Sequence, residues 1–170
     1  MLAAVHARVG RVALREGFLL LCAHDTQGLD FSTVNEAWHR DWPEPIRSLL
    51  IFGKEDLLAY YYATVPRLAD EMGRQPVVRV NVHEEPHALP VASNMDWFFD
   101  TYSRYLEALV RSPDYEEEGS AALGFPWDIP EIIARDRQLV EMLRAGRFDF
   151  LMPKGEETRA WVAQVVGAVV

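Results

Sequence analysis

The strongest constraint on the fold is a block of three strand-like segments that a long amphipathic segment follows. Residues 49–52 and 57–65 are apolar, aromatic and β-branched, and residues 53–56 between them predict a hairpin turn. After Pro76, apolar and polar residues alternate, which predicts a half-buried antiparallel strand. Its inward residues would be Val78, Val80 and Val82, and its outward residues Arg79, Asn81 and His83.

The segment after these strands predicts a helix over residues 94–110. Ser93 is placed to cap this helix, and Asp96 lies near the positive end of the helix dipole. The apolar residues recur at helical spacing and form one stripe: Met95, Phe98, Phe99, Tyr102, Leu106, Leu109 and Val110. We therefore expect the helix to pack on the sheet.

The N-terminal part carries three shorter signals. Valines at helical spacing indicate a short amphipathic helix: Val5, Val9 and Val12. Residues 17–24 form an apolar run that fits either a helix or a strand. Thr33 and Glu36 have the spacing of a capping box, which predicts a short helix that reaches Trp38.

The C-terminal part predicts two helices and one strand after a loop over residues 112–125. Asp128 is expected to cap the first helix, with Pro130 in its first turn and Gly146 at its end. Residues 148–152 fit one more strand, and Glu156 begins a last helix.

This order of elements indicates an α+β fold: a single domain over residues 1–170, with a mixed, mostly antiparallel sheet and flanking helices. The core would span residues 49–110, and residues 112–170 would form a helical C-terminal extension. A chain of 170 residues, 49% of them hydrophobic, is long and apolar enough to bury one sizeable core.

The net charge of −9 is concentrated in one segment. Between Glu84 and Ala134 there are eleven acidic and two basic residues, so this segment carries the whole excess. Such a charge argues against a general affinity for nucleic acid or for an anionic membrane. The densest part, Asp114 and residues 116–118, fits either a solubilising loop or a surface that is complementary to a basic partner.

One motif resembles a catalytic signature. His83-Glu84-Glu85-Pro86-His87 matches the H-E-x-x-H pattern of zinc peptidases, which requires both histidines on one face of a continuous helix. Pro86 disfavours helical geometry at Glu85, so we expect a strand end and an exposed acidic turn, with no zinc on His83 or His87.

No other pattern predicts catalysis or a cofactor. Cys22, His24 and Asp25 are neighbours in sequence, whereas a nucleophile and its base usually come from separate parts of a fold. Cys22 is the sole cysteine, which excludes an internal disulfide and indicates a reducing compartment. The N-terminal apolar run is too short for an export signal, and no run approaches a membrane span, so a cytoplasmic protein is expected.

Three segments resemble the SUKH superfamily, which includes many bacterial immunity proteins and a yeast cell-wall regulator. Residues 50–61 resemble its central hairpin, with Lys54-Glu55-Asp56 in place of the usual glycine- and aspartate-rich turn. Residues 76–83 resemble its next strand, and residues 91–99 resemble the entry into its helix. The resemblance implies a mixed sheet with flanking helices and a partner-binding role, and it supplies no catalytic residue.

Three functions follow as hypotheses. The first is an immunity protein that occludes a basic toxin domain, for example a nuclease, as a monomer or weak homodimer. Its candidate contact residues are Asp114, Tyr115, Glu116, Glu117, Glu118, Trp127 and Asp128, with a surface around Trp38 and Trp42 as the alternative. The second is an intracellular regulatory or scaffold protein of the same fold. The third is a hydrolase that uses His24 or His39 in a pocket.

Overall fold

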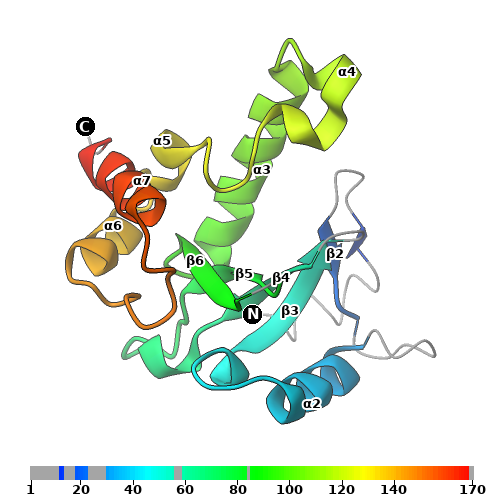
Figure 1. Ribbon diagram of the computed structural model, residues 1–170, viewed down its shortest axis with the longest axis vertical. Coiled ribbons are helices and arrows are strands. Elements are labelled where there is room, and N and C mark those ends of the chain that lie inside the picture. Colours follow the sequence, from blue (N-terminus) through cyan, green and yellow to red (C-terminus); the bar gives the residue numbers. More distant parts are fainter. Residues whose placement is uncertain (1–11, 14–17, 23–29, 56–58, 84, 169–170) are drawn as a thin grey trace.

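The computed structural model describes residues 12–13, 18–22, 30–55, 59–83 and 85–168 (Figure 1). Six strands form one sheet in chain order: β1 (Val12–Ala13), β2 (Phe18–Leu20), β3 (Leu50–Glu55), β4 (Tyr60–Thr64), β5 (Val77–Asn81) and β6 (His87–Ala92). Every pair of neighbouring strands is antiparallel, so the sheet is a simple meander.

The described helices lie between and after the strands. They are α2 (Phe31–Asp41), α3 (Met95–Arg111), α4 (Tyr115–Glu118), α5 (Pro130–Ile133), α6 (Arg137–Arg144) and α7 (Glu156–Gly167), with short 3₁₀ turns η1 (Ile46–Ser48), η2 (Pro66–Leu68) and η3 (Gly119–Ala122). Among them, none is long and apolar enough to cross a membrane. The predicted α+β class, with a mostly antiparallel sheet and flanking helices, is confirmed.

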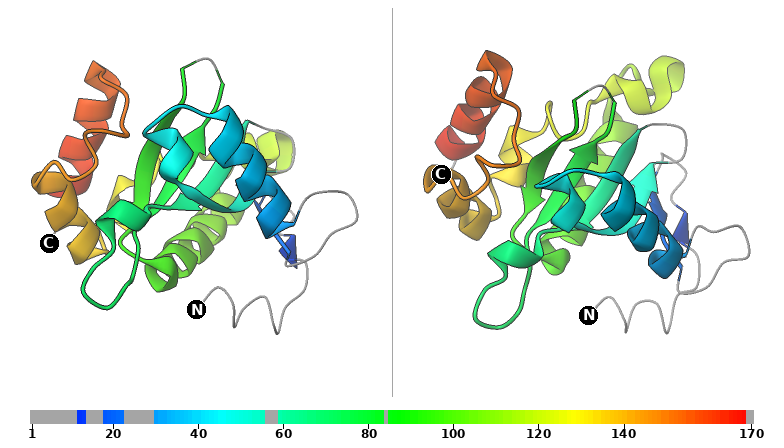
Figure 2. Two further views of the ribbon diagram at one scale, coloured as in Figure 1. Left: turned by 90° about the horizontal axis from the view of Figure 1, so that it is seen from below. Right: turned by 60° about the horizontal axis from the view of Figure 1, so that its bottom comes forward.

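The sheet is covered on both faces, because successive residues of a strand point to opposite sides. Tyr61 of β4 packs against Trp38 of α2, with ring centroids 5.1 Å apart. Its neighbour Tyr62 packs against Phe98 of α3 at 5.3 Å. Figure 2 shows α2 and α3 on either side of the strands, while α5, α6 and α7 gather beyond the β6 edge.

An aromatic cluster fills the space between the sheet and α3. Its members are Phe18, Phe52, Tyr62, Phe98, Tyr102 and Phe125. Gly53 makes room for it, because a Cβ there would lie 2.7 Å from Cε2 of Phe18. The cluster therefore fixes β2 and β3 against α3 through ring packing.

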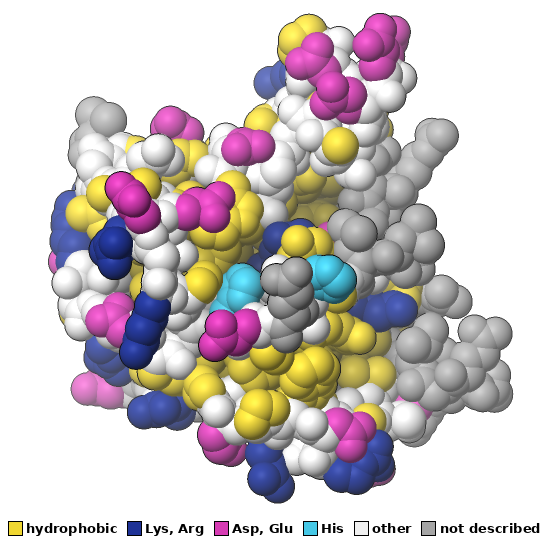
Figure 3. All heavy atoms as spheres, viewed as in Figure 1, with side chains coloured by type: hydrophobic (Ala, Val, Ile, Leu, Met, Phe, Trp, Pro, Cys, Tyr) yellow, Lys and Arg dark blue, Asp and Glu magenta, His cyan; other side chains and the backbone are white. Residues whose placement is uncertain are grey.

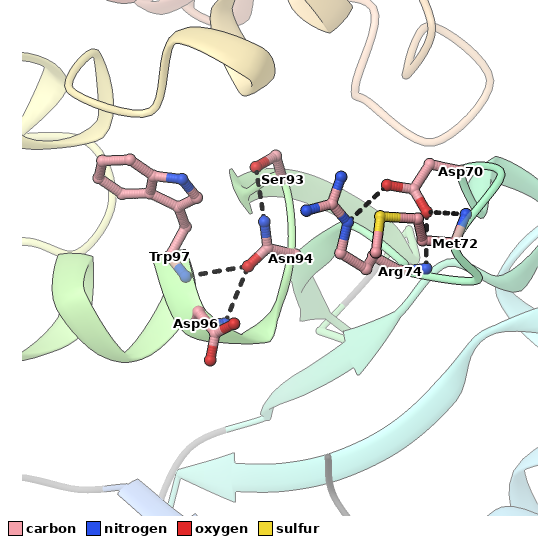
Figure 4. Close-up of polar contacts among 7 residues, drawn as sticks. All are labelled: Asp70, Met72, Arg74, Ser93, Asn94, Asp96 and Trp97. Atoms are coloured by element: carbon pink, nitrogen blue, oxygen red, sulfur yellow. Dashed lines mark hydrogen bonds and ion pairs between the residues drawn. The ribbon is translucent and has the colours of Figure 1, made fainter.

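The entry into α3 is held by a side-chain cap (Figure 4). Oδ1 of Asn94 accepts hydrogen bonds from the backbone N–H of Asp96 (2.9 Å) and Trp97 (3.2 Å). The predicted cap, Ser93, is wrong by one residue, because the backbone of Asn94 is the extended position before the helix. The backbone N–H of Ser93 instead donates to Asp136.

The N-terminal predictions are corrected where the structure describes them. Val12 lies in strand β1, so it does not continue a helix, while Val5 and Val9 lie outside the described residues. The ambiguous run over 17–24 contains strand β2. The helix α2 is capped by Asp30, whose side chain accepts from the N–H of Thr33, so the predicted capping box begins three residues too late.

Two strand predictions also change. β3 continues through Gly53 to Glu55, so the turn begins later than predicted, and residues 56–58 lie outside the described part. β6 was not predicted, because Pro90 breaks the pattern of a strand. The proline fits because β6 is the last strand of the sheet and the β5–β6 register shifts next to the Val78–Pro90 pair.

The C-terminal part differs most from its prediction. The expected loop over 112–125 contains α4 and η3. The expected single helix after Asp128 is two helices, since the buried side chain of Asp136 caps a separate α6. Residues 148–152 form turns and not a strand, although the carbonyl of Leu151 accepts the N–H of Ala88 in β6 at 2.8 Å.

Candidate functional site

The acidic surface predicted as a loop is a one-turn helix at the far end of α3. α3 ends at Arg111 and is followed by Ser112 and Pro113, and α4 then begins at Tyr115. Gly119, with φ of 58°, ends α4 in a conformation that glycine adopts without strain. Figure 1 shows α4 at the end of the molecule opposite α2, and Figure 3 shows acidic side chains gathered there.

The carboxylates of this surface, which we call the acidic tip (Asp114 and residues 116–118), are exposed to solvent. Within the described part of the chain none of them forms an ion pair. Five acidic side chains elsewhere in the described residues do pair: Asp41 with Arg40, Asp70 with Arg74, Glu55 with Arg79, Asp100 with Arg104 and Glu141 with Arg144. The acidic tip therefore presents negative charge that its own fold does not neutralise.

The acidic tip is fixed to the core by two aromatic residues. Tyr115 is partly buried and packs against the hydrophobic core, so its ring anchors α4. The hydroxyl of Tyr105 in α3 donates to the carbonyl of Leu123 at 3.2 Å, which ties the segment after η3 to the same helix. The charges are thus carried by a rigid support, as binding residues on surface segments often are.

The two remaining predicted contact residues have structural partners. Trp127 is half-buried and packs edge-to-face on Trp161 of α7, with centroids 5.9 Å apart. The carboxylate of Asp128 accepts the backbone N–H of Gly124 at 2.7 Å and so closes a turn. Neither residue belongs to the helical turn that holds the acidic tip, and Asp128 does not cap α5, whose first flanking residue is Ile129.

The alternative surface around the tryptophans of α2 is largely part of the core. Trp38 is only 4% exposed, and its indole N–H donates to the carbonyl of Ile46 at 2.8 Å. Trp42 is half-buried and packs on Trp38 at a centroid distance of 5.4 Å. These contacts within the chain explain the presence of both tryptophans without a binding partner.

The sequence did not reveal a buried polar cluster on the α3 face of the sheet. Glu55 and Arg79, with side chains 13% and 11% exposed, form a two-pronged ion pair with distances of 2.8 and 3.2 Å. The hydroxyl of Tyr62 donates to the same carboxylate at 3.0 Å, and the guanidinium of Arg79 lies 3.5 Å from the ring centroid of Tyr60. Arg79 was predicted to face solvent, but α3 covers that face.

The electrostatics of this cluster favour a structural role. Burial acts to lower the pKa of Arg79, but the hydrogen bonds and charge of Glu55 outweigh it and raise the pKa. Burial raises the pKa of Tyr62 well above its ordinary value, so the hydroxyl stays protonated as a donor. The three side chains link β3, β4 and β5 and satisfy one another.

The histidines have ordinary partners. His83 follows β5 and His87 begins β6, so the two histidines lie on neighbouring antiparallel strand ends and not on one helix face. Nδ1 of His87 contacts the carbonyl of Glu85 at 2.9 Å, and His39 contacts that of Leu49 at 3.3 Å. The expected strand end and turn are confirmed for the described residues 81–83 and 85–87.

The other sequence candidates give no assembled site in the described residues. Cys22 is half-buried just after β2, and its carbonyl accepts the N–H of Phe31 at 2.9 Å. His24 and Asp25 lie outside the described residues. Within the described part of the chain, no group of three or more His, Cys, Asp or Glu side chains is arranged to hold a metal ion.

Comparison of the chain with protein-family models found no match, and comparisons with curated proteins and with solved structures found none either. A functional proposal for this chain therefore depends on the arrangement of its described residues.

Proposed function

We propose that this chain is a non-catalytic protein-binding module, and that it acts as an immunity protein of the SUKH type. In this proposal it neutralises a basic toxin domain by occluding its surface, in the cytoplasm and without a cofactor. The observation that carries the proposal is the acidic tip, whose exposed carboxylates have no ion-pair partner in the described part of the chain.

Charge of this kind acts mainly on the encounter between two proteins. A surface of one sign attracts a partner of the opposite sign and raises the association rate constant from about 10⁵–10⁶ toward 10⁸ M⁻¹s⁻¹ at low salt. The same charge, with a net −9 for the chain, repels nucleic acid and anionic membranes. A basic protein surface is therefore the complementary partner.

The attachment of the acidic tip to a packed helix supports this role. α3 is a helix of 17 residues whose buried face packs on the sheet, and it holds α4 at one end of the molecule (Figure 1). A rigid surface loses little conformational freedom when it binds, so more of the interaction energy remains for the complex. The antiparallel sheet followed by α3 also agrees with the arrangement that the SUKH resemblance implies.

Co-expression tests the proposal. If a gene beside the one for this chain encodes a secreted protein with a variable C-terminal toxin domain, that domain should arrest growth alone and not together with this chain. The two proteins should also co-purify as a complex. A toxic domain that remains toxic during co-expression and does not bind would contradict the proposal, and would favour the regulatory or scaffold hypothesis.

A further inference from the structure

A second surface, distant in sequence from the acidic tip, combines an apolar lining with basic side chains. A groove of about 650 Å³ lies between α6, α7 and the segment that joins them. Its lining includes three cationic side chains, Arg144, Lys154 and Arg159, and one carboxylate, Asp149. This volume is in the range of about 300–1,000 Å³ that small-molecule sites occupy.

The floor of the groove is apolar. One stripe of α7 lines it with residues four positions apart, Thr158, Val162 and Val166, which share one helix face. Leu143 of α6 and Met152 of the joining segment complete the apolar lining. The groove therefore offers a surface for a hydrocarbon group, beside cations at its rim.

The end of the groove is the N-terminus of α7, a helix of 12 residues. Its N-cap is Gly155, which has no side chain to accept a hydrogen bond from the first turn. The N–H groups of the first turn have no partner inside a helix, and their dipole attracts an anion. A Cβ added at Gly155 would meet no atom within 4 Å, so the cap position itself has open space.

Thr158 is an independent sign of a ligand at the same place. The residue is 5% exposed and lines the groove, and its hydroxyl has no hydrogen-bond partner in the described part of the chain. A buried hydroxyl without a partner costs free energy, so such groups usually have one. A ligand oxygen in the groove would supply it.

Two of the three cationic side chains that line the groove are available for such a ligand. Lys154 and Arg159 are exposed and form no ion pair with any described residue. Arg144 is held by Glu141 and by the carbonyl of Val166, at 3.3 Å from the latter. The first-turn acids Glu156 and Glu157 are exposed and do not belong to the groove lining. Figure 3 shows basic side chains interspersed with acidic ones on the side of the molecule where α6 and α7 lie.

We propose that this groove binds a single-chain amphiphile with an anionic head. The head, a carboxylate or a phosphate, accepts hydrogen bonds from the first turn of α7 and from the hydroxyl of Thr158, between Lys154 and Arg159. The chain lies along Val162 and Val166. This binding is separate from the acidic tip and from the proposed toxin partner.

The binding test uses decanoate, below its critical micelle concentration, with the ¹⁵N-labelled chain and amide chemical shifts as the readout. We expect saturable shifts centred on residues 155–159 and on the groove. Decanol, which lacks the charge, and acetate, which lacks the chain, should each bind at least tenfold more weakly. Decyl phosphate distinguishes the two head groups, and either one binding there supports the proposal.

Three variants define the site. Thr158→Val keeps the shape and removes the hydroxyl, and should weaken decanoate at least fivefold without a loss of thermal stability. Gly155→Asp supplies a carboxylate to the open N–H groups, and should weaken decanoate more than tenfold while stability is kept or raised. Arg159→Gln should also weaken binding tenfold, whereas Arg47→Gln, an exposed residue of η1, should leave it unchanged.

Three results would overturn the proposal. Decanol binding as tightly as decanoate would show that the charge has no role. Full decanoate affinity in a folded Gly155→Asp variant would place the head group elsewhere. Concentration-dependent dimerisation that shifts the same amides without ligand would show that a second copy of the chain covers the groove.

Discussion

Asp136 connects the helical C-terminal part to the sheet, and its replacement should be unusually costly. Its side chain is 0% exposed and accepts two backbone hydrogen bonds. One comes from Ser93, between β6 and α3, at 2.6 Å, and the other from Leu139 in the first turn of α6, at 3.0 Å. One carboxylate thus caps α6 and satisfies a donor 43 residues away in the chain.

The expected cost follows from these two bonds. Loss of an N-cap costs about 1 kcal/mol. The N–H of Ser93, in a residue only 3% exposed, would lose its acceptor inside the protein, which costs about 1–3 kcal/mol more. Asp136→Ala should therefore lower the free energy of unfolding by about 2–4 kcal/mol. Asp136→Asn, which keeps one acceptor oxygen, should lie between this variant and the wild type.

Asp30→Ala is the matched control for this change. Asp30 caps α2 by accepting the N–H of Thr33 within the first turn of its own helix, so its loss should cost only about 1 kcal/mol. Urea unfolding of the three variants, followed by circular dichroism and tryptophan fluorescence, measures the difference. Equal costs for Asp136→Ala and Asp30→Ala would refute the two-bond explanation.

Two further predictions concern the polar cluster beneath α3. Glu55→Gln should lower the free energy of unfolding by about 2–4 kcal/mol, because it leaves Arg79 charged and largely buried. In urea unfolding, replacement of both Glu55 and Arg79 by methionine should cost less than this single change. The reverse order of stability would contradict this explanation. Burial raises the pKa of both Tyr62 and Tyr102, so an absorbance titration at 295 nm should show at least two of the six tyrosines still protonated until the protein unfolds. Because an unfolded tyrosine ionises near pH 10, the stability that these two tyrosines contribute is complete below pH 10 and is lost as the pH rises above it. Reversible ionisation of all six tyrosines in the folded state would contradict this prediction.

Periodicity in the sequence predicted the parts of the fold that local residues determine. The alternation after Pro76 gave β5, and the apolar stripe after Asn94 gave α3. Contacts distant in sequence decided the rest. Pro90 is accepted in β6 because the strand lies at the sheet edge. The break between α5 and α6 lies at Asp136, whose side chain caps α6 and also accepts the N–H of the distant Ser93.

For the candidate site, too, local composition could be predicted but contacts between distant residues could not. The acidic composition of residues 114–118 was visible in the sequence, but their position in a helical turn at the end of α3 was not. The contact of Trp127 with Trp161 was not visible either, because it depends on how α7 packs. The groove beside α7 could not be predicted from the sequence, since Thr158 and Arg159 of α7 and Leu143 of α6 line it together only through tertiary packing.

The proposed function depends on attraction between the acidic tip and a basic protein partner. The change that tests it replaces Glu116, Glu117 and Glu118 with lysine. The control variant makes the same change in charge at exposed glutamates on three other segments, Glu36, Glu71 and Glu131. Surface substitutions of this kind usually change the free energy of unfolding by no more than about 0.5 kcal/mol each, so thermal melts should show that both variants fold.

The measurement is the association rate constant with the cognate toxin domain, taken by stopped flow at 0.05 M and at 1 M salt. For the lysine variant of the acidic tip the account predicts a rate at least tenfold below that of the control variant at low salt. The difference should nearly vanish at 1 M, where the Debye length falls to about 3 Å. Equal association rates for the two folded variants at low salt would contradict the claim, and would leave the acidic tip as a solubilising surface.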